Sequence, residues 1–199
     1  MGSVLVLSIA VGPAAAVTFC KANQSPCSEK NSYPVPTEFV ATLQKATSAV
    51  FSGTPSVSCS EAGWTGETTV AGTPLLGQGT SVTFGSCGGG CTSVEARNLP
   101  WRGEVEATTP GNGTVTVTGN KEGNPSVKLS ECLSGATCFY GFTTATAEVE
   151  GGETSMFTIV QTLNREAGSN KVLCALTNAF TAKYRLITPT EPIFISALP

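Results

Sequence analysis

Four glutamates are the residues of this sequence whose type and spacing could perform a reaction. They form two motifs, Glu104-Val-Glu106 and Glu148-Val-Glu150. Because side chains alternate across a β-strand, each motif places two carboxylates on one face, about 6.6–6.8 Å apart along the strand. Glycoside hydrolases use two carboxylates about 5–9.5 Å apart, one as acid and the other as base or nucleophile. A glycoside hydrolase using paired glutamates is therefore one hypothesis for the function.

The surroundings of these glutamates favour a solvent-exposed strand face instead. Glu104 shares its face with Arg102 and with the threonines of the neighbouring segment Thr114–Thr118. The sequence contains no histidine, and all 14 acidic residues are glutamate. This composition excludes Ser-His and Cys-His nucleophiles, imidazole metal ligands, EF-hand loops and aspartic dyads. We therefore predict a protein without catalytic activity, with no metal site and no cofactor.

Aromatic side chains offer a second chemistry, because an aromatic face can cover the apolar side of a sugar ring. Trp64 lies in the glycine-rich segment Glu61–Gly66, which we expect to be an exposed loop, whereas Trp101 is in phase with Val105 and is expected in the core. A carbohydrate-binding module is thus an alternative function. The candidate ligand-binding residues from both lines of reasoning are Trp64, Tyr33, Tyr140, Glu104, Glu106, Glu148 and Glu150.

The first residues predict export. Met1–Ala16 contains the apolar run Val4–Val11 and ends in three alanines, which is typical of a signal peptide with an A-x-A cleavage site. The run is too short to span a bilayer, so no transmembrane segment is predicted. With a net charge of −3 and 13% charged residues, the chain has no basic patch that could neutralise nucleic acid. We predict a secreted protein, extracellular or at the cell surface, with an unknown glycan or protein ligand.

Eight cysteines follow the predicted cleavage site, and an even number in an exported chain predicts four disulfides. The cysteines are Cys20, Cys27, Cys59, Cys87, Cys91, Cys132, Cys138 and Cys174. Short spacings favour Cys20–Cys27, Cys87–Cys91 and Cys132–Cys138, which leaves Cys59–Cys174. The pairing of Cys59 with Cys87 and of Cys91 with Cys174 is an open alternative, because sequence alone does not fix connectivity. The spacings do not match zinc-ribbon knuckles.

The elements that would position these residues are short strands with a period of two. Ser81–Thr118 reads as four consecutive strands of an antiparallel meander. Hairpins are predicted for Trp101–Thr108 with Thr114–Thr118, and for Thr143–Glu150 with Glu153–Leu163 across Gly151-Gly152. About a dozen strands spaced near ten residues predict an all-β protein, a single antiparallel, jelly-roll-like β-sandwich over residues 17–199. Further predicted strands are Val172–Leu176 and an edge strand at Ile193–Ser196.

Several short motifs resemble a family of small exported, cysteine-containing bacterial proteins of unknown function. They are Cys20-Lys-Ala-Asn-Gln-Ser-Pro-Cys27, Tyr33-Pro34, Val57-Ser-Cys59, Val82-Thr-Phe84 and Asn98-Leu-Pro-Trp101. The resemblance implies a β-rich fold and assigns no catalytic residue. From all of these observations we predict a secreted, non-catalytic binding or structural module.

Overall fold

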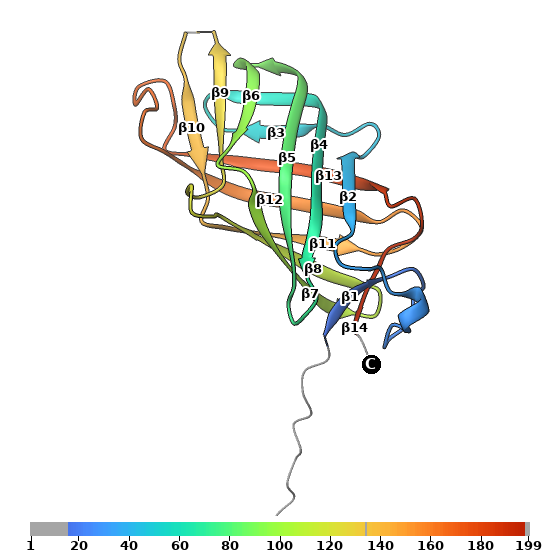
Figure 1. The fold of residues 1–199 in the computed structure, drawn as a ribbon. Coiled ribbons are helices and arrows are strands. Elements are labelled where there is room, and N and C mark those ends of the chain that lie inside the picture. The colour runs from blue at the N-terminus through green and yellow to red at the C-terminus, as the bar shows by residue number, and fades with distance from the viewer. Residues whose placement is uncertain (1–15, 134, 198–199) are drawn as a thin grey trace, which may run out of the picture.

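The computed structural model describes residues 16–133 and 135–197, and the regular secondary structure of this part of the chain is almost entirely β-strand (Figure 1). The strands are β1 (Val17–Cys20), β2 (Glu38–Leu43), β3 (Ala49–Ser52), β4 (Ser56–Val70), β5 (Leu75–Gly89), β6 (Cys91–Arg97), β7 (Trp101–Thr109), β8 (Asn112–Thr118), β9 (Ser126–Cys132), β10 (Cys138–Gly141), β11 (Thr144–Glu150), β12 (Met156–Arg165), β13 (Thr177–Thr188) and β14 (Phe194–Ala197). One 3-10 turn spans Glu29–Asn31. No helix in the described ranges is long and apolar enough to cross a membrane. The predicted signal peptide, apart from Ala16, lies outside them.

Eight of the strands form a closed antiparallel ring in the order β4, β5, β7, β8, β11, β12, β13 and β2. The ring closes because β2 pairs with two strands at once. Ala41 of β2 lies opposite Leu186 of β13 on one side and opposite Trp64 of β4 on the other. We refer to this ring as the closed sheet. It replaces the predicted two-layer sandwich, since alternation identifies strands but does not say whether the first and last of them meet.

The predicted meander over Ser81–Thr118 is only partly formed. All four of its strands exist, but β5 pairs with β7 rather than with β6. Both predicted hairpins exist, although the second one turns over residues 151–155 rather than Gly151-Gly152 alone, because Glu150 pairs with Met156. Strand β6 instead pairs with β9, and β9 and β10 continue from β12 as an extension of the closed sheet. The predicted strand Val172–Leu176 is wrong, because this segment is a loop.

Four disulfides are present, as predicted, but their connectivity differs from the favoured one. The pairs are Cys20–Cys27, Cys59–Cys87, Cys91–Cys132 and Cys138–Cys174. Cys59 and Cys87 are register partners in β4 and β5, which confirms one pair of the alternative, and Cys91 is the register partner of Cys132 in β6 and β9. Spacing was misleading here because β5 extends through Gly89 beside β4, whereas β6 begins at Cys91 and pairs with β9.

The interior of the closed sheet is packed with aromatic rings. Trp64 lies edge-on to Trp101, with ring centroids 5.4 Å apart, and edge-on to Phe157 at 6.4 Å. Phe157 in turn stacks on Tyr184 at 4.9 Å. Such edge-to-face and stacked pairs add to the free energy gained by burying the rings. These rings form a layer across the middle of the closed sheet.

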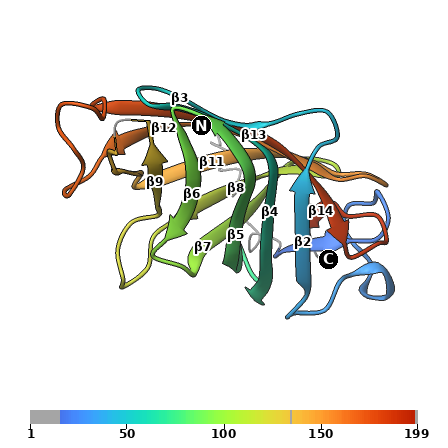
Figure 2. The ribbon, with the colours of Figure 1, turned by 90° about the horizontal axis from the view of Figure 1, so that it is seen from above.

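The two ends of the described chain meet in a separate two-stranded sheet, which we call the terminal sheet. Strand β1 pairs antiparallel with β14 in a register that runs from Val17 opposite Ala197 to Cys20 opposite Phe194. The predicted edge strand Ile193–Ser196 is therefore paired on one side. Figures 1 and 2 both place β1 and β14 at the end of the molecule away from β9 and β6.

Candidate functional site

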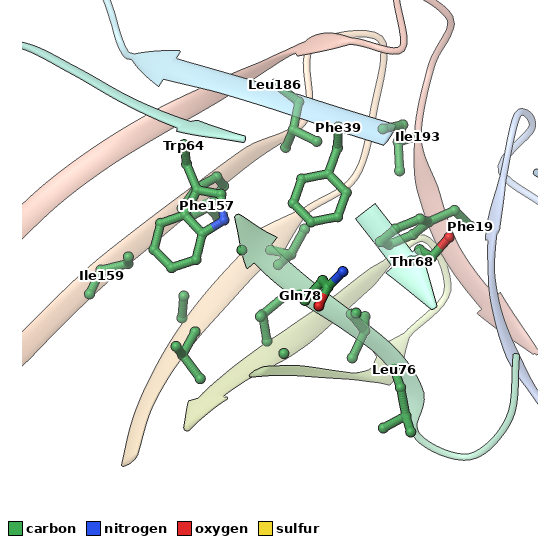
Figure 3. A pocket seen from close by; sticks show the side chains of 18 residues that line it. Phe19, Phe39, Trp64, Thr68, Leu76, Gln78, Phe157, Ile159, Leu186 and Ile193 are labelled. Carbon is green, nitrogen blue, oxygen red and sulfur yellow. The ribbon is translucent and has the colours of Figure 1, made fainter. Parts of the chain in front are cut away.

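A cavity of about 80 Å³ lies inside the closed sheet, between the aromatic layer and the terminal sheet (Figure 3). Phe19 of β1 and Ile193, just before β14, contribute to its lining from the terminal end. The other lining residues come from the closed sheet: Phe39, Trp64, Thr68, Leu76, Gly77, Gln78, Gly79, Gly103, Val105, Val115, Val117, Ala147, Val149, Phe157, Ile159 and Leu186.

The space exists because glycines occupy positions where side chains would point inward. In β7, Gly103 lies two residues from Trp101 and from Val105, both of which are buried. Side chains alternate along a strand, so a side chain at position 103 would enter the interior. Its register partner in β5 is Gly77, which also lacks a side chain. Two facing glycines thus leave this part of the wall without inward side chains.

The lining is almost wholly apolar. Its polar side chains are those of Thr68 and Gln78, and both are engaged in hydrogen bonds. The Oγ1 of Thr68 accepts a hydrogen bond from the backbone N–H of Thr37 at 2.8 Å, and the Nε2 of Gln78 donates to Glu67 at 2.7 Å. Apolar cavities of this kind stay free of water, and an engineered cavity of about 150 Å³ binds benzene or xenon. The site can therefore accept a small hydrocarbon group.

Trp64 divides this cavity from a second void. A space of about 30 Å³ lies on the other side of the aromatic layer, and the side chains of Trp64, Val117 and Ile159 line both spaces. The side chain of Trp64 is only 9% exposed. The predicted exposed loop at Glu61–Gly66 is wrong, because these residues belong to β4 and the alternation of the strand turns the indole inward.

The two tyrosines of the candidate set are also buried and lie at opposite ends of the molecule. The hydroxyl group of Tyr140 lies 3.0 Å from the carbonyl oxygen of Thr54 and 3.1 Å from that of Ala175. Tyr33 packs beside the terminal sheet, and its hydroxyl group lies 3.0 Å from the carbonyl oxygen of Pro192. Burial, reinforced by the carboxylate of Glu191, raises the pKa of Tyr33 to about 12. These rings do not come together, and they present no open face on which a sugar could stack.

The four glutamates lie on the outer side of the closed sheet. Thr114 of β8 is the register partner of Glu106 on one side and of Glu148 on the other, so two carboxylates flank one threonine. Two strand spacings separate them, about 9.4–9.8 Å. Glu104 is half-buried, and Glu150, like the other two, is exposed. The wall of the sheet therefore separates these carboxylates from the buried aromatic rings, and the glutamates and aromatics do not share a groove.

Reasoning from the sequence did not find the cavity. Its residues read as ordinary core positions, and the chemistry-bearing residue types lie elsewhere. One signal was present: a glycine in phase with buried residues, as in Trp101-Arg-Gly103-Glu-Val105, removes an inward side chain from a strand. A single such glycine is also found at bends and where two backbones approach closely. It indicates a cavity only when the residue opposite it on the neighbouring strand is known.

Comparisons with protein-family models, with curated proteins and with solved structures found no match to this chain.

Proposed function

We propose that this chain is an exported, non-catalytic binding protein whose closed sheet accepts the apolar part of a small ligand. The cavity beside Trp64 and Gly103 is the observation that supports this function. Four disulfides support export, since such bonds persist in oxidising compartments. Eight-stranded closed sheets can hold one small ligand in their interior.

The size and chemistry of the cavity define the ligand group. About 80 Å³ is roughly half the volume of the engineered cavity that binds benzene, so the cavity takes the end of an alkyl chain and the rest of a longer chain stays outside. Each methylene transferred from water into such a site contributes about 0.8 kcal/mol, which corresponds to about a fourfold gain in affinity. Because the lining offers no free charge, the polar part of the ligand stays outside the cavity.

The proposal is tested with straight-chain alkanoic acids of increasing length, including octanoate. Trp64 lines the cavity and is one of only two tryptophans, so its fluorescence reports occupation. We expect saturable changes in emission, with affinity rising about fourfold per methylene until the cavity is full and then levelling off. The proposal is wrong if no chain length gives a saturable response. Binding of sugars without any response to alkyl chains would support the carbohydrate-binding alternative.

A further inference from the structure

The way into the cavity is a separate question, because strand pairing continues all the way around its side wall. Along its circumference the eight strands are hydrogen-bonded to one another. Toward the middle of the molecule, the layer of Trp64, Trp101 and Phe157 blocks the interior. What remains is the end covered by Phe19 and Ile193, which belong to the terminal sheet and its approach rather than to the closed sheet.

The terminal sheet is strongly connected within itself. The disulfide Cys20–Cys27 closes its first segment, and the backbone N–H of Cys27 donates to the carbonyl oxygen of Ala197 at 2.7 Å. Ser196 donates from its hydroxyl group to the carbonyl oxygen of Gln24 at 2.6 Å. An ion pair of 2.8 Å joins Lys21 to Glu191. These links tie the two ends of the described chain into one unit.

The same unit rests on three hairpin turns of the closed sheet with few hydrogen bonds. Val17 donates to the carbonyl oxygen of Gly72 at 2.7 Å, in the turn between β4 and β5. Ile195 donates to Gly111 at 3.0 Å, between β7 and β8. Ile193 and Gly152 exchange two hydrogen bonds of 2.9 and 3.2 Å, between β11 and β12, where the hydroxyl group of Ser155 also donates to Ile193.

Glycines in the β7–β8 hairpin let the terminal sheet approach closely. A Cβ atom at Gly113 would lie 2.7 Å from Cδ1 of Ile195, and one at Gly111 would lie 3.2 Å from the ring of Phe194. The side chain of Ile195 is fully buried at this contact, yet it does not line the cavity. Ile195 therefore holds the terminal sheet in place without contacting a ligand in the cavity.

We propose that the terminal sheet is the gate of the cavity, and that it opens as a unit to admit an apolar ligand. This proposal rests on the proposed function. Val17, Phe19 and Ile195 are buried against the closed sheet, but local opening of this small element still requires less free energy than unfolding of the whole chain. Because the polar part of the ligand stays outside the cavity, the bound ligand holds the gate open. The association rate and the apparent affinity therefore both rise with the fraction of free molecules that are open, and the dissociation rate stays unchanged.

Ile195→Val tests the gate because it removes only Cδ1, the atom that packs against Gly113. We expect octanoate to associate about two- to tenfold faster, with an unchanged dissociation rate and a correspondingly lower dissociation constant, as measured by stopped-flow fluorescence of Trp64. The control is Leu129→Ala on β9, whose side chain is fully buried, lines neither cavity and lies away from the terminal sheet. It destabilises the whole chain more than Ile195→Val does.

The two variants separate the routes of entry. If the gate opens locally, only Ile195→Val accelerates association of octanoate. If Leu129→Ala accelerates association as much or more, the ligand enters by general unfolding and the gate proposal is wrong. An unchanged association rate in Ile195→Val, with normal saturable binding in the natural sequence, also overturns the gate while leaving the proposed function intact. Absence of saturable binding in the natural sequence overturns the proposed function, and the gate proposal with it.

Discussion

Filling the cavity from Gly103 is the perturbation whose effect the structure defines best. A Cβ atom at this position would lie 3.8 Å from the carbonyl oxygen of Gly77 and 4.0 Å from Cγ1 of Val115, which are ordinary van der Waals distances. Gly103→Ala therefore fits without displacing a neighbour. Gly103→Val adds two further methyl groups, directed into the cavity of about 80 Å³.

The size of the effect follows from the cavity volume. Unfilled cavities destabilise proteins by about 24 cal/mol per Å³, so complete filling of this one contributes about 2 kcal/mol to the free energy of unfolding. For a chain of this length such a gain raises Tm by about 4–8 °C. Replacing glycine also reduces the entropy of the unfolded chain, which adds about 0.4–1 kcal/mol. We expect stability to increase from Gly103 through Gly103→Ala to Gly103→Val.

The assays are thermal unfolding and octanoate binding, with Gly77→Ala as the matched control. Gly77 is the register partner of Gly103, but its Cβ atom would lie 2.8 Å from the carbonyl oxygen of Glu67, a backbone atom. Gly77→Ala should therefore lower stability by about 1–3 kcal/mol, as overpacking does. Gly103→Val should raise Tm and abolish binding. A lower Tm for Gly103→Ala, or undiminished binding by Gly103→Val, would refute the reasoning.

Three further predictions concern residues outside the cavity. Tyr140→Phe should lower the free energy of unfolding by about 1–3 kcal/mol in chemical denaturation, because buried carbonyl groups lose their phenol donor. The pKa of Tyr33 is raised from 10.0 to about 12, so its neutral form stabilises the fold fully below pH 10, and this contribution is lost as the pH rises through about 12. Denaturation of Tyr33→Phe across this interval should show a smaller alkaline loss than the natural sequence, and an identical loss would count against the burial of this phenol. Glu106→Gln with Glu148→Gln should change stability by less than about 0.5 kcal/mol and leave octanoate binding intact, because both carboxylates are exposed on the outer wall.

Local strand patterns were predictable from the sequence because alternation is a local property. The hairpin of Trp101–Thr108 with Thr114–Thr118 is confirmed, but its turn is Pro110-Gly111 rather than the predicted Thr109–Gly113, because Thr109 pairs with Asn112. The inward placement of Trp101 is confirmed by the same alternation. The all-β class and the presence of four disulfides are confirmed as well.

Long-range relations were not predictable, because each depends on which strands meet. Closure of the sheet depends on β2 lying between β13 and β4, and neither contact leaves a trace in the alternation of Glu38–Leu43. The disulfide Cys91–Cys132 requires β6 to leave its sequence neighbour β5 for β9. The cavity was not predicted for a related reason. The candidate residues were chosen because their side chains have known chemistry, whereas the cavity arises from the lack of side chains at Gly77 and Gly103.

A crystal structure determined under xenon pressure tests the central claim most directly, since xenon occupies dry apolar cavities. The account predicts a xenon atom inside the closed sheet, bounded by Trp64, Gly103 and Phe19, in the natural sequence and not in Gly103→Val. Ordered water in this space, or side chains that fill it, would contradict the claim.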